Sequence, residues 1–141
     1  MISARLLVCS RKKMTASITK EMVAAFIKLS GDAAPLHTDD QFAISHGFDG
    51  CLVHGALIVA LLSRFVGTQF PGPQSLWLQC DIGFRNPCYA PTTVRFEGTV
   101  TQYSAAMGAV SLAIDVTDDL NRQIATAKTT HKIFGGYGTS E

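Results

Sequence analysis

The second half of the chain alternates hydrophobic and polar residues, which is the pattern of β-strands with one buried face. The hydrophobic positions of the two clearest segments are Val94, Phe96, Val100, Val110, Leu112, Ile114 and Val116. Two further strands are expected over Leu76–Arg85 and Gln123–Phe134, with a turn at Asp118–Asn121 before the last one. Together these segments predict an antiparallel sheet.

The first half favours helices. Hydrophobic residues spaced three and four apart follow Thr19, a residue type that caps helix N-termini, and the helix that they predict ends at Gly31. A structured loop is expected over Gly31–Asp40, followed by a short helix over Asp39–His46. Upstream of these helices, Ala4–Met14 is expected to form the first strand.

The most hydrophobic segment predicts a central helix from Gly55 to about Phe70. This helix is apolar on nearly every face and must therefore be surrounded, which in a chain of 141 residues only a curved sheet can do. The order of elements predicts one domain over residues 1–141 in the α+β class, with the sheet wrapped around the helix. The apolar run is shorter than the ~20 residues of a membrane span, so no membrane association is expected.

Composition narrows the possible functions. The net charge is +1 and no basic stripe is present, which argues against a nucleic-acid partner. The four cysteines form no CxxC pair and indicate free thiols in a reducing compartment. Residues 1–20 are basic and free of acidic residues, as in a mitochondrial transit peptide. Because the fold needs a strand there, we expect a cytoplasmic protein, with the mitochondrial matrix as the alternative.

The segment Ser30–Asp39 carries the residues best suited to chemistry. Asp32 and His37 are five residues apart in a loop stiffened by Pro35, so a carboxylate and an imidazole could meet around one water. Adding water to an activated double bond needs a base and an acid, and this pair can divide the two tasks. The backbone N–H of Gly55, at the start of the central helix, is suited to negative charge developing on a substrate oxygen.

Each of these residues also has a purely structural interpretation. Asp32 could be no more than a turn or capping residue after the first helix, and His37 could be a hydrogen-bonded structural histidine. Ser63, a lone hydroxyl in the central helix, could meet the catalytic loop or bond back to the carbonyl of Val59. The histidines and aspartates of residues 39–54 lack HExxH-like spacing, so we predict no metal and no cofactor.

The combination of these residues resembles a known family. The motif Ser30-Gly31-Asp32-x-x-Pro35-Leu36-His37-x-Asp39, then Val53-His54-Gly55, Ser63 and Phe70-Pro71-Gly72, is similar to that of MaoC-like, (R)-specific enoyl-CoA hydratases. The resemblance covers nearly the whole chain. It implies a hot-dog fold, usually dimeric, that hydrates or dehydrates thioesters of CoA or acyl carrier protein. It further implies that Asp32 and His37 activate water while the Gly55 amide faces the thioester oxygen.

From these arguments the predicted catalytic residues are Asp32, His37, Gly55 and Ser63. The residues beside them that we expect to contact substrate are Pro35, His54 and Leu57. Two positions depart from the family pattern. Ala34 stands where the family usually has Asn and cannot orient the loop through a side-chain hydrogen bond. Ala90-Pro91-Thr92 stands where the family tends to have a Gly-Asp turn.

Two other functions fit the same scaffold. A hot-dog acyl thioesterase would direct water at the carbonyl carbon instead of the double bond. The second is a non-catalytic module that binds acyl thioesters. This alternative remains because Ala34 lacks the side-chain hydrogen bond that could orient the catalytic loop. We also expect a homodimer, because a sheet of about five strands has an edge that a second copy can pair with.

The alternation along the predicted strands also gives an expected orientation for two aromatic residues. His131 alternates in phase with Ala125, Ala127, Thr129 and Ile133 and is expected to point inward. Trp77 falls in phase with Gln79, Asp81 and Arg85 and is expected either to line an interface or tunnel, or to be a surface aromatic.

Overall fold

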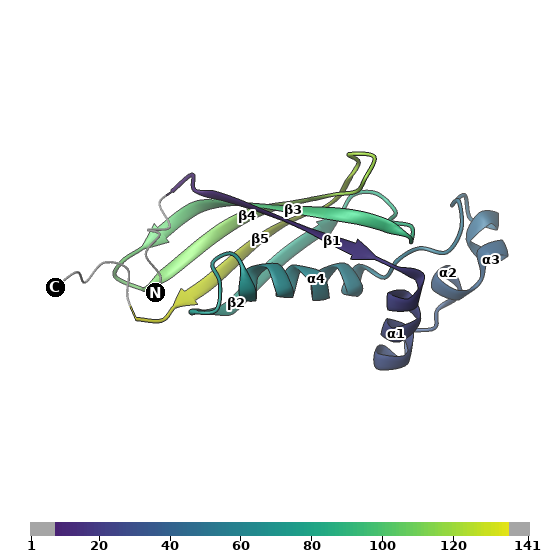
Figure 1. Ribbon diagram of the computed structural model, residues 1–141, viewed down its shortest axis with the longest axis horizontal. Helices are drawn as coiled ribbons and strands as arrows, with labels where there is room; N and C mark the ends of the chain where they lie inside the picture. Colours follow the sequence, from purple (N-terminus) through teal and green to yellow (C-terminus); the bar gives the residue numbers. More distant parts are fainter. Residues whose placement is uncertain (1–7, 136–141) are drawn as a thin grey trace.

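A computed structural model describes residues 8–135 of the chain. Its elements, in chain order, are β1 (Arg11–Ile18), α1 (Lys20–Ser30), α2 (Pro35–Thr38), α3 (Asp40–Ser45), α4 (Gly55–Thr68), β2 (Ser75–Phe84), β3 (Thr92–Ser104), β4 (Ala109–Thr117) and β5 (Gln123–Ile133). The strands form one antiparallel sheet in the order β1-β3-β4-β5-β2. Figure 1 shows this sheet arching over α4, with α1, α2 and α3 gathered at one end.

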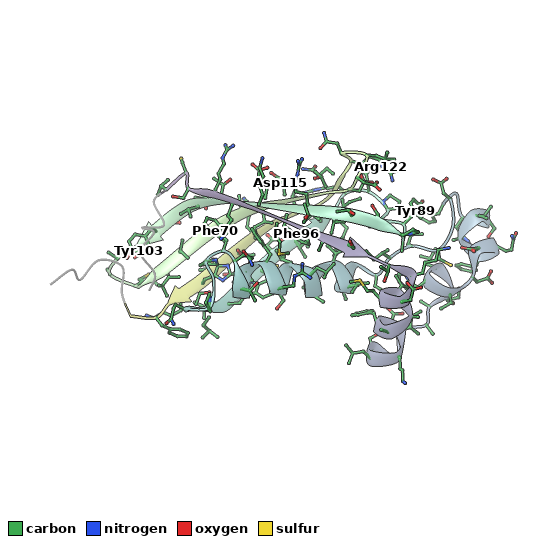
Figure 2. The ribbon with its side chains drawn as sticks, viewed as in Figure 1. Phe70, Tyr89, Phe96, Tyr103, Asp115 and Arg122 are labelled. Carbon is green, nitrogen blue, oxygen red and sulfur yellow. The ribbon has the colours of Figure 1, made fainter. Side chains whose placement is uncertain are left out.

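The core lies between the sheet and α4. The alternating residues of β3 and β4 point into it, as the period of two predicted, and Leu62, Phe65 and Val66 of α4 meet them. Figure 2 shows Phe70 and Phe96 between the sheet and the helix, while Asp115 lies on the opposite, solvent-facing side of the sheet. The predicted α+β arrangement of a sheet over a central helix is therefore confirmed.

Several boundaries agree with the sequence and others do not. Thr19 caps α1 by accepting a hydrogen bond from the N–H of Met22, and Gly31 ends the helix with a left-handed φ of 75°. The expected first strand over residues 4–14 is instead β1 at Arg11–Ile18, and residues 4–7 lie outside the described residues. The loop expected over residues 31–40 contains the short helix α2.

The sheet covers only one side of α4, which corrects the expectation that this helix is surrounded. Its exposed positions include Ala56, Ala60, Ser63 and Gly67. Since alanine and glycine count as apolar but offer little surface to bury, the composition of the helix could not distinguish its covered side from its open side. No helix within residues 8–135 combines the length and the hydrophobicity that crossing a membrane requires.

A β-bulge corrects the predicted orientation of Trp77. The pairing of β2 with β5 shifts between Trp77 and Gln79, so these two residues do not share a face. Trp77 pairs with the buried His131 and its ring stacks on that imidazole, with 6.3 Å between the ring centroids. His131 itself points inward, as predicted, and is 1% exposed.

The burial of His131 predicts an acid-sensitive fold. Burial lowers the pKa of His131 from 6.5 to about 4. Between these two pH values the unfolded chain binds a proton that the folded chain does not, so the contribution of His131 is complete above pH 6.5 and is lost toward pH 4. Urea titration at pH 7 and at pH 4 measures the free energy of unfolding at each pH. We expect this free energy to fall between the two pH values by about 3 kcal/mol more in the wild type than in His131→Gln. Equal losses in the two proteins would exclude His131 as the source.

Candidate active site

The loop that carries Asp32 is fixed by local hydrogen bonds. The Oγ of Ser30 donates to the carbonyl of Phe26 (2.7 Å) and accepts from the N–H of Asp32 (3.1 Å). The Asp32 carboxylate in turn accepts from the N–H of Ala34 (3.2 Å) through Oδ1. The turn role considered for Asp32 is therefore real, but it occupies Oδ1 and leaves Oδ2 directed at His37.

His37 is held by the backbone of a distant segment. Pro35 begins α2 at its first position, and His37 lies in the same four-residue helix. The Nδ1 of His37 lies 2.7 Å from the carbonyl oxygen of Leu52, and because a carbonyl only accepts, Nδ1 carries the hydrogen. Nε2 then faces Asp32 Oδ2 at 3.9 Å, which is too long for a direct hydrogen bond. Nε2 is therefore left available for proton transfer.

Gly55 is the first residue of α4, where backbone N–H groups have no partner within the helix. The preceding residue, His54, provides no side-chain cap. A Cβ built on Gly55 would lie 2.7 Å from Cζ of Phe84, so the ring of Phe84 rests directly against this glycine. The absence of a side chain at Gly55 thus serves the packing of Phe84 as well as the approach of a substrate to the helix N-terminus.

Two cavities meet at His37. One, of about 430 Å³, is lined by His37, Leu52, Val53, Gly55, Ile58, Phe84, Arg85, Asn86, Pro87 and Cys88. The other, of about 730 Å³, lies beside α1 and the segment 49–53, and Tyr89 borders it at the end of the sheet near the helices (Figure 2). Because the smaller cavity contains both His37 and Gly55, it is the better candidate for the reacting centre.

A thiol in the smaller cavity is unsuited to nucleophilic chemistry. Burial raises the pKa of Cys88 to about 11, so this side chain is protonated at neutral pH. Since the thiolate is the nucleophilic form of cysteine, covalent catalysis by Cys88 is disfavoured. His37, with the Asp32 carboxylate 3.9 Å away, is therefore a better candidate than Cys88 for chemistry at this cavity.

The structure brings together some of the predicted residues and separates others. His37 and Gly55 line the smaller cavity, and the carboxylate of Asp32 lies 3.9 Å from His37. Pro35 starts the helix that carries His37. Leu57, expected to contact substrate, is instead buried in the core at 6% exposure, and Ile58 lines the cavity in its place. His54, also expected to contact substrate, is 1% exposed; its ring stacks on that of His37, and its Nε2 bonds to the backbone carbonyl of Asp32.

Ser63 does not join this cluster within one chain. It lies on the exposed side of α4, eight residues after Gly55, or about 12 Å along a helix that rises about 1.5 Å per residue. Within the described part of the chain its hydroxyl bonds neither to the loop of Asp32 nor to the carbonyl of Val59. Neither of the two contacts expected for Ser63 is therefore present within one chain.

Three functional neighbours were not predicted from the sequence. The Leu52 carbonyl that orients His37 is a backbone group, which no side-chain pattern could reveal. Phe84 and Ile58, which line the smaller cavity, were not singled out as cavity residues. The alternation of β2 beyond its bulge is the signal that could have placed Phe84 beside the helix.

The same cluster contains a possible metal-ligand set. Asp32, His37 and His54 each offer one ligand atom, and the three atoms lie within 4.8 Å of one another. His54, however, donates through Nε2 to the carbonyl of Asp32, and its Nδ1 is buried. A metal could bind all three residues only by replacing that hydrogen bond or by entering the buried side of the ring.

Comparison with known proteins adds a family assignment. The family model described as MaoC like domain matches residues 9–119. An (R)-specific enoyl-CoA hydratase from Aeromonas caviae is 40% identical over 79 residues, which cover 56% of this chain and 59% of that protein. A 3-hydroxybutyryl-CoA dehydratase from Methylorubrum extorquens is 31% identical over 70 residues, covering 50% of this chain and 45% of that protein. The matched part thus spans about half the length of these relatives.

Solved structures share the same architecture over a longer stretch. An (R)-hydratase from A. caviae involved in PHA biosynthesis superposes with a TM-score of 0.84 at 28% identity, covering 94% of this chain and 99% of that one. An R-hydratase from Pseudomonas aeruginosa superposes with a TM-score of 0.83 at 26% identity, covering 91% of this chain and 82% of that one. The fold is therefore the predicted hot-dog fold.

Proposed function

The chain belongs to the family of MaoC-like domains, and from this and the geometry of its site we propose that it is a hydratase or dehydratase. It would interconvert trans-2-enoyl and (R)-3-hydroxyacyl thioesters of CoA or acyl carrier protein. The observation that carries the proposal is the approach of Asp32 Oδ2 to His37 Nε2 at 3.9 Å, beside a cavity that also contains the start of α4 at Gly55.

The two side chains divide the proton transfers of the reaction. In the direction of hydration, the Asp32 carboxylate takes a proton from water as the water oxygen bonds to C3 of the substrate. The imidazolium of His37 delivers a proton from Nε2 to C2, and the proton on Asp32 then crosses to His37 to restore the pair. The N–H of Gly55 donates to the thioester oxygen, on which negative charge develops between the two steps.

Thioester hydrolysis is the competing reaction on this scaffold. It would direct the same water at the carbonyl carbon and release a free thiol. Two arms of one assay separate the reactions: loss of enoyl absorbance from trans-2-enoyl-CoA substrates of increasing chain length, and release of CoA thiol. We expect absorbance to fall without thiol release. Thiol release at the same rate would indicate a thioesterase, and acyl-CoA binding with neither change would indicate a binding module.

A reducing compartment is part of the proposal. The four cysteines, all within the described residues, are free thiols: Cys9, Cys51, Cys80 and Cys88. We place the protein in the cytoplasm, with the mitochondrial matrix as the alternative, because both compartments keep thiols reduced. Cell fractionation with an antibody to the chain distinguishes these locations.

The proposed active form is a homodimer. Strand β2 is an edge of the sheet, and two of its hydrophobic side chains, Leu76 and Leu78, are 51% and 56% exposed. Pairing β2 with its copy across a two-fold axis would cover this edge. The start of α4 contacts the end of β2 at Gly55 and Phe84, and Ser63 is exposed on the same helix, so we expect Ser63 to face the second copy instead of its own loop.

A charge on β2 is therefore expected to separate the two copies. Leu78→Lys places an ammonium on the pairing edge, and we expect sedimentation at micromolar concentration to change from dimer to monomer, with hydratase activity falling in parallel. Leu120→Lys is the matched control, because Leu120 is 72% exposed on the turn between β4 and β5. This turn precedes the start of β5, whereas the part of β2 around Leu78 pairs with β5 near Thr130. A wild-type protein that sediments as a monomer with full activity would contradict the dimer.

A further inference from the structure

We propose that His54 is a positioning residue that holds Asp32, His37 and Gly55 in their relative places, an inference that rests on the proposed hydratase function. His54 is 1% exposed, which leaves little of its surface for contact with a substrate. Yet its side chain and backbone reach each of the three groups assigned to catalysis. Each of these contacts constrains a different part of the site.

The first contact fixes the loop of Asp32. The Nε2 of His54 lies 2.9 Å from the carbonyl oxygen of Asp32, twenty-two residues earlier in the chain. A carbonyl oxygen accepts only, so Nε2 carries the hydrogen and donates it. This bond ties the backbone of an exposed, loop-borne carboxylate to the buried start of α4. Without it, Asp32 would be held only by the local bonds of its own turn.

The second contact fixes the plane of the His37 ring. The imidazoles of His37 and His54 stack with 3.7 Å between centroids and 22° between planes. Phe26 of α1 packs against His54 with its ring centroid 4.8 Å away. The hydrogen bond to Leu52 sets which way Nδ1 of His37 points, and the stack prevents the ring from tilting about that bond. The two constraints together aim Nε2 of His37 at Asp32.

The third contact is through the backbone. His54 is the N-cap residue of α4, and its carbonyl accepts hydrogen bonds from the N–H groups of Leu57 and Ile58. The N–H of Gly55 belongs to the peptide bond that follows His54. The conformation of His54 therefore sets the direction of the amide that we assign to the thioester oxygen.

The unused nitrogen of His54 supports a positioning role over a general packing role. Within the described part of the chain, Nδ1 is buried and has no hydrogen-bond partner. Leaving a buried acceptor unpaired costs free energy, which an apolar ring of similar shape would avoid. The imidazole is favoured over such a ring only if the Nε2–H donor to Asp32 is needed.

Two substitutions separate the two side-chain contacts. His54→Phe keeps a ring to stack on His37 but removes the donor to Asp32, while His54→Gln keeps an N–H donor near the position of Nε2 but removes the ring. We expect His54→Phe to lower kcat roughly tenfold or more with KM changed less than about twofold, because misplaced groups slow chemistry more than binding. We expect the kcat of His54→Gln to lie between that of His54→Phe and that of the wild type. His46→Gln, on the exposed end of α3, is the control and should match the wild type.

A spectroscopic measurement tests the contacts independently of turnover. Long-range ¹H–¹⁵N spectra of the wild-type protein should show His54 as the Nε2–H tautomer. The proposal is overturned if His54 carries its hydrogen on Nδ1, if kcat is unchanged in both variants, or if KM alone rises. A wild-type protein that does not hydrate enoyl thioesters would refute the proposed function, and the tautomer measurement would still test the contact with Asp32.

Discussion

Replacing Asp32 with Asn, or His37 with Ala, is expected to lower hydratase turnover by roughly a hundredfold or more, the usual effect of losing a general acid or base. Asn keeps the shape of Asp32 and an oxygen for the N–H of Ala34, but it cannot take a proton from water. Ala at position 37 removes the imidazole that the carbonyl of Leu52 orients. Steady-state kinetics with a trans-2-enoyl-CoA measure both losses.

Folding should survive both changes, because Asp32 is exposed and His37 lies in a short helix at the end of the molecule. Two matched controls test whether removing a carboxylate or an imidazole elsewhere on the surface lowers turnover in the same way. Asp119→Asn changes an exposed carboxylate on the turn between β4 and β5, and His46→Ala changes an exposed imidazole on α3. Both controls should keep wild-type turnover. A near-normal rate in Asp32→Asn or His37→Ala would refute the assignment.

The second large effect is expected at the start of the central helix. The Cβ of Gly55→Ala would lie 2.7 Å from the ring of Phe84, so this ring must move. Phe84 is 51% exposed and can swing aside, which should preserve folding while displacing the ring within the cavity. The methyl group also hinders approach to the N–H of Gly55. We expect kcat/KM to fall at least about tenfold, toward the hundredfold typical of losing an oxyanion donor.

A double-mutant cycle with Phe84→Leu identifies the cause of that loss. If the displaced ring blocks the cavity, the smaller side chain should restore most of the activity of Gly55→Ala. If the methyl group blocks the N–H, the double variant should remain as slow as Gly55→Ala. Full activity in Gly55→Ala alone would mean that the amide of Gly55 does not face the thioester.

Local signals in the sequence predicted much of the fold. Thr19 and Gly31 marked the two ends of α1 because capping and a left-handed φ depend on one or two residues. The alternation in β3 and β4 likewise identified the inward face, since each strand pairs on both sides and keeps its phase across most of its length. The motif around Asp32 and His37 identified the loop at which the cavities meet.

The errors arose where the outcome depended on other segments. The phase of β2 changes at a bulge set by its pairing with β5, so the sequence alternation alone misplaced Trp77. The open side of α4 depends on where the sheet ends, which the helix's own residues do not determine. His54 was expected at the substrate, but the loop of Asp32 and the ring of Phe26 close over it.

The most direct test of the central claim follows the oxygen of water. The protein is incubated with crotonyl-CoA in H₂¹⁸O, and the products are analysed by mass spectrometry and by chiral separation of the 3-hydroxy acid. The account predicts intact thioester with ¹⁸O in the C3 hydroxyl of (R)-3-hydroxybutyryl-CoA, and loss of this product in Asp32→Asn. Label in a free carboxylate together with released CoA, or ¹⁸O in the C3 hydroxyl at the same rate in Asp32→Asn, would contradict it.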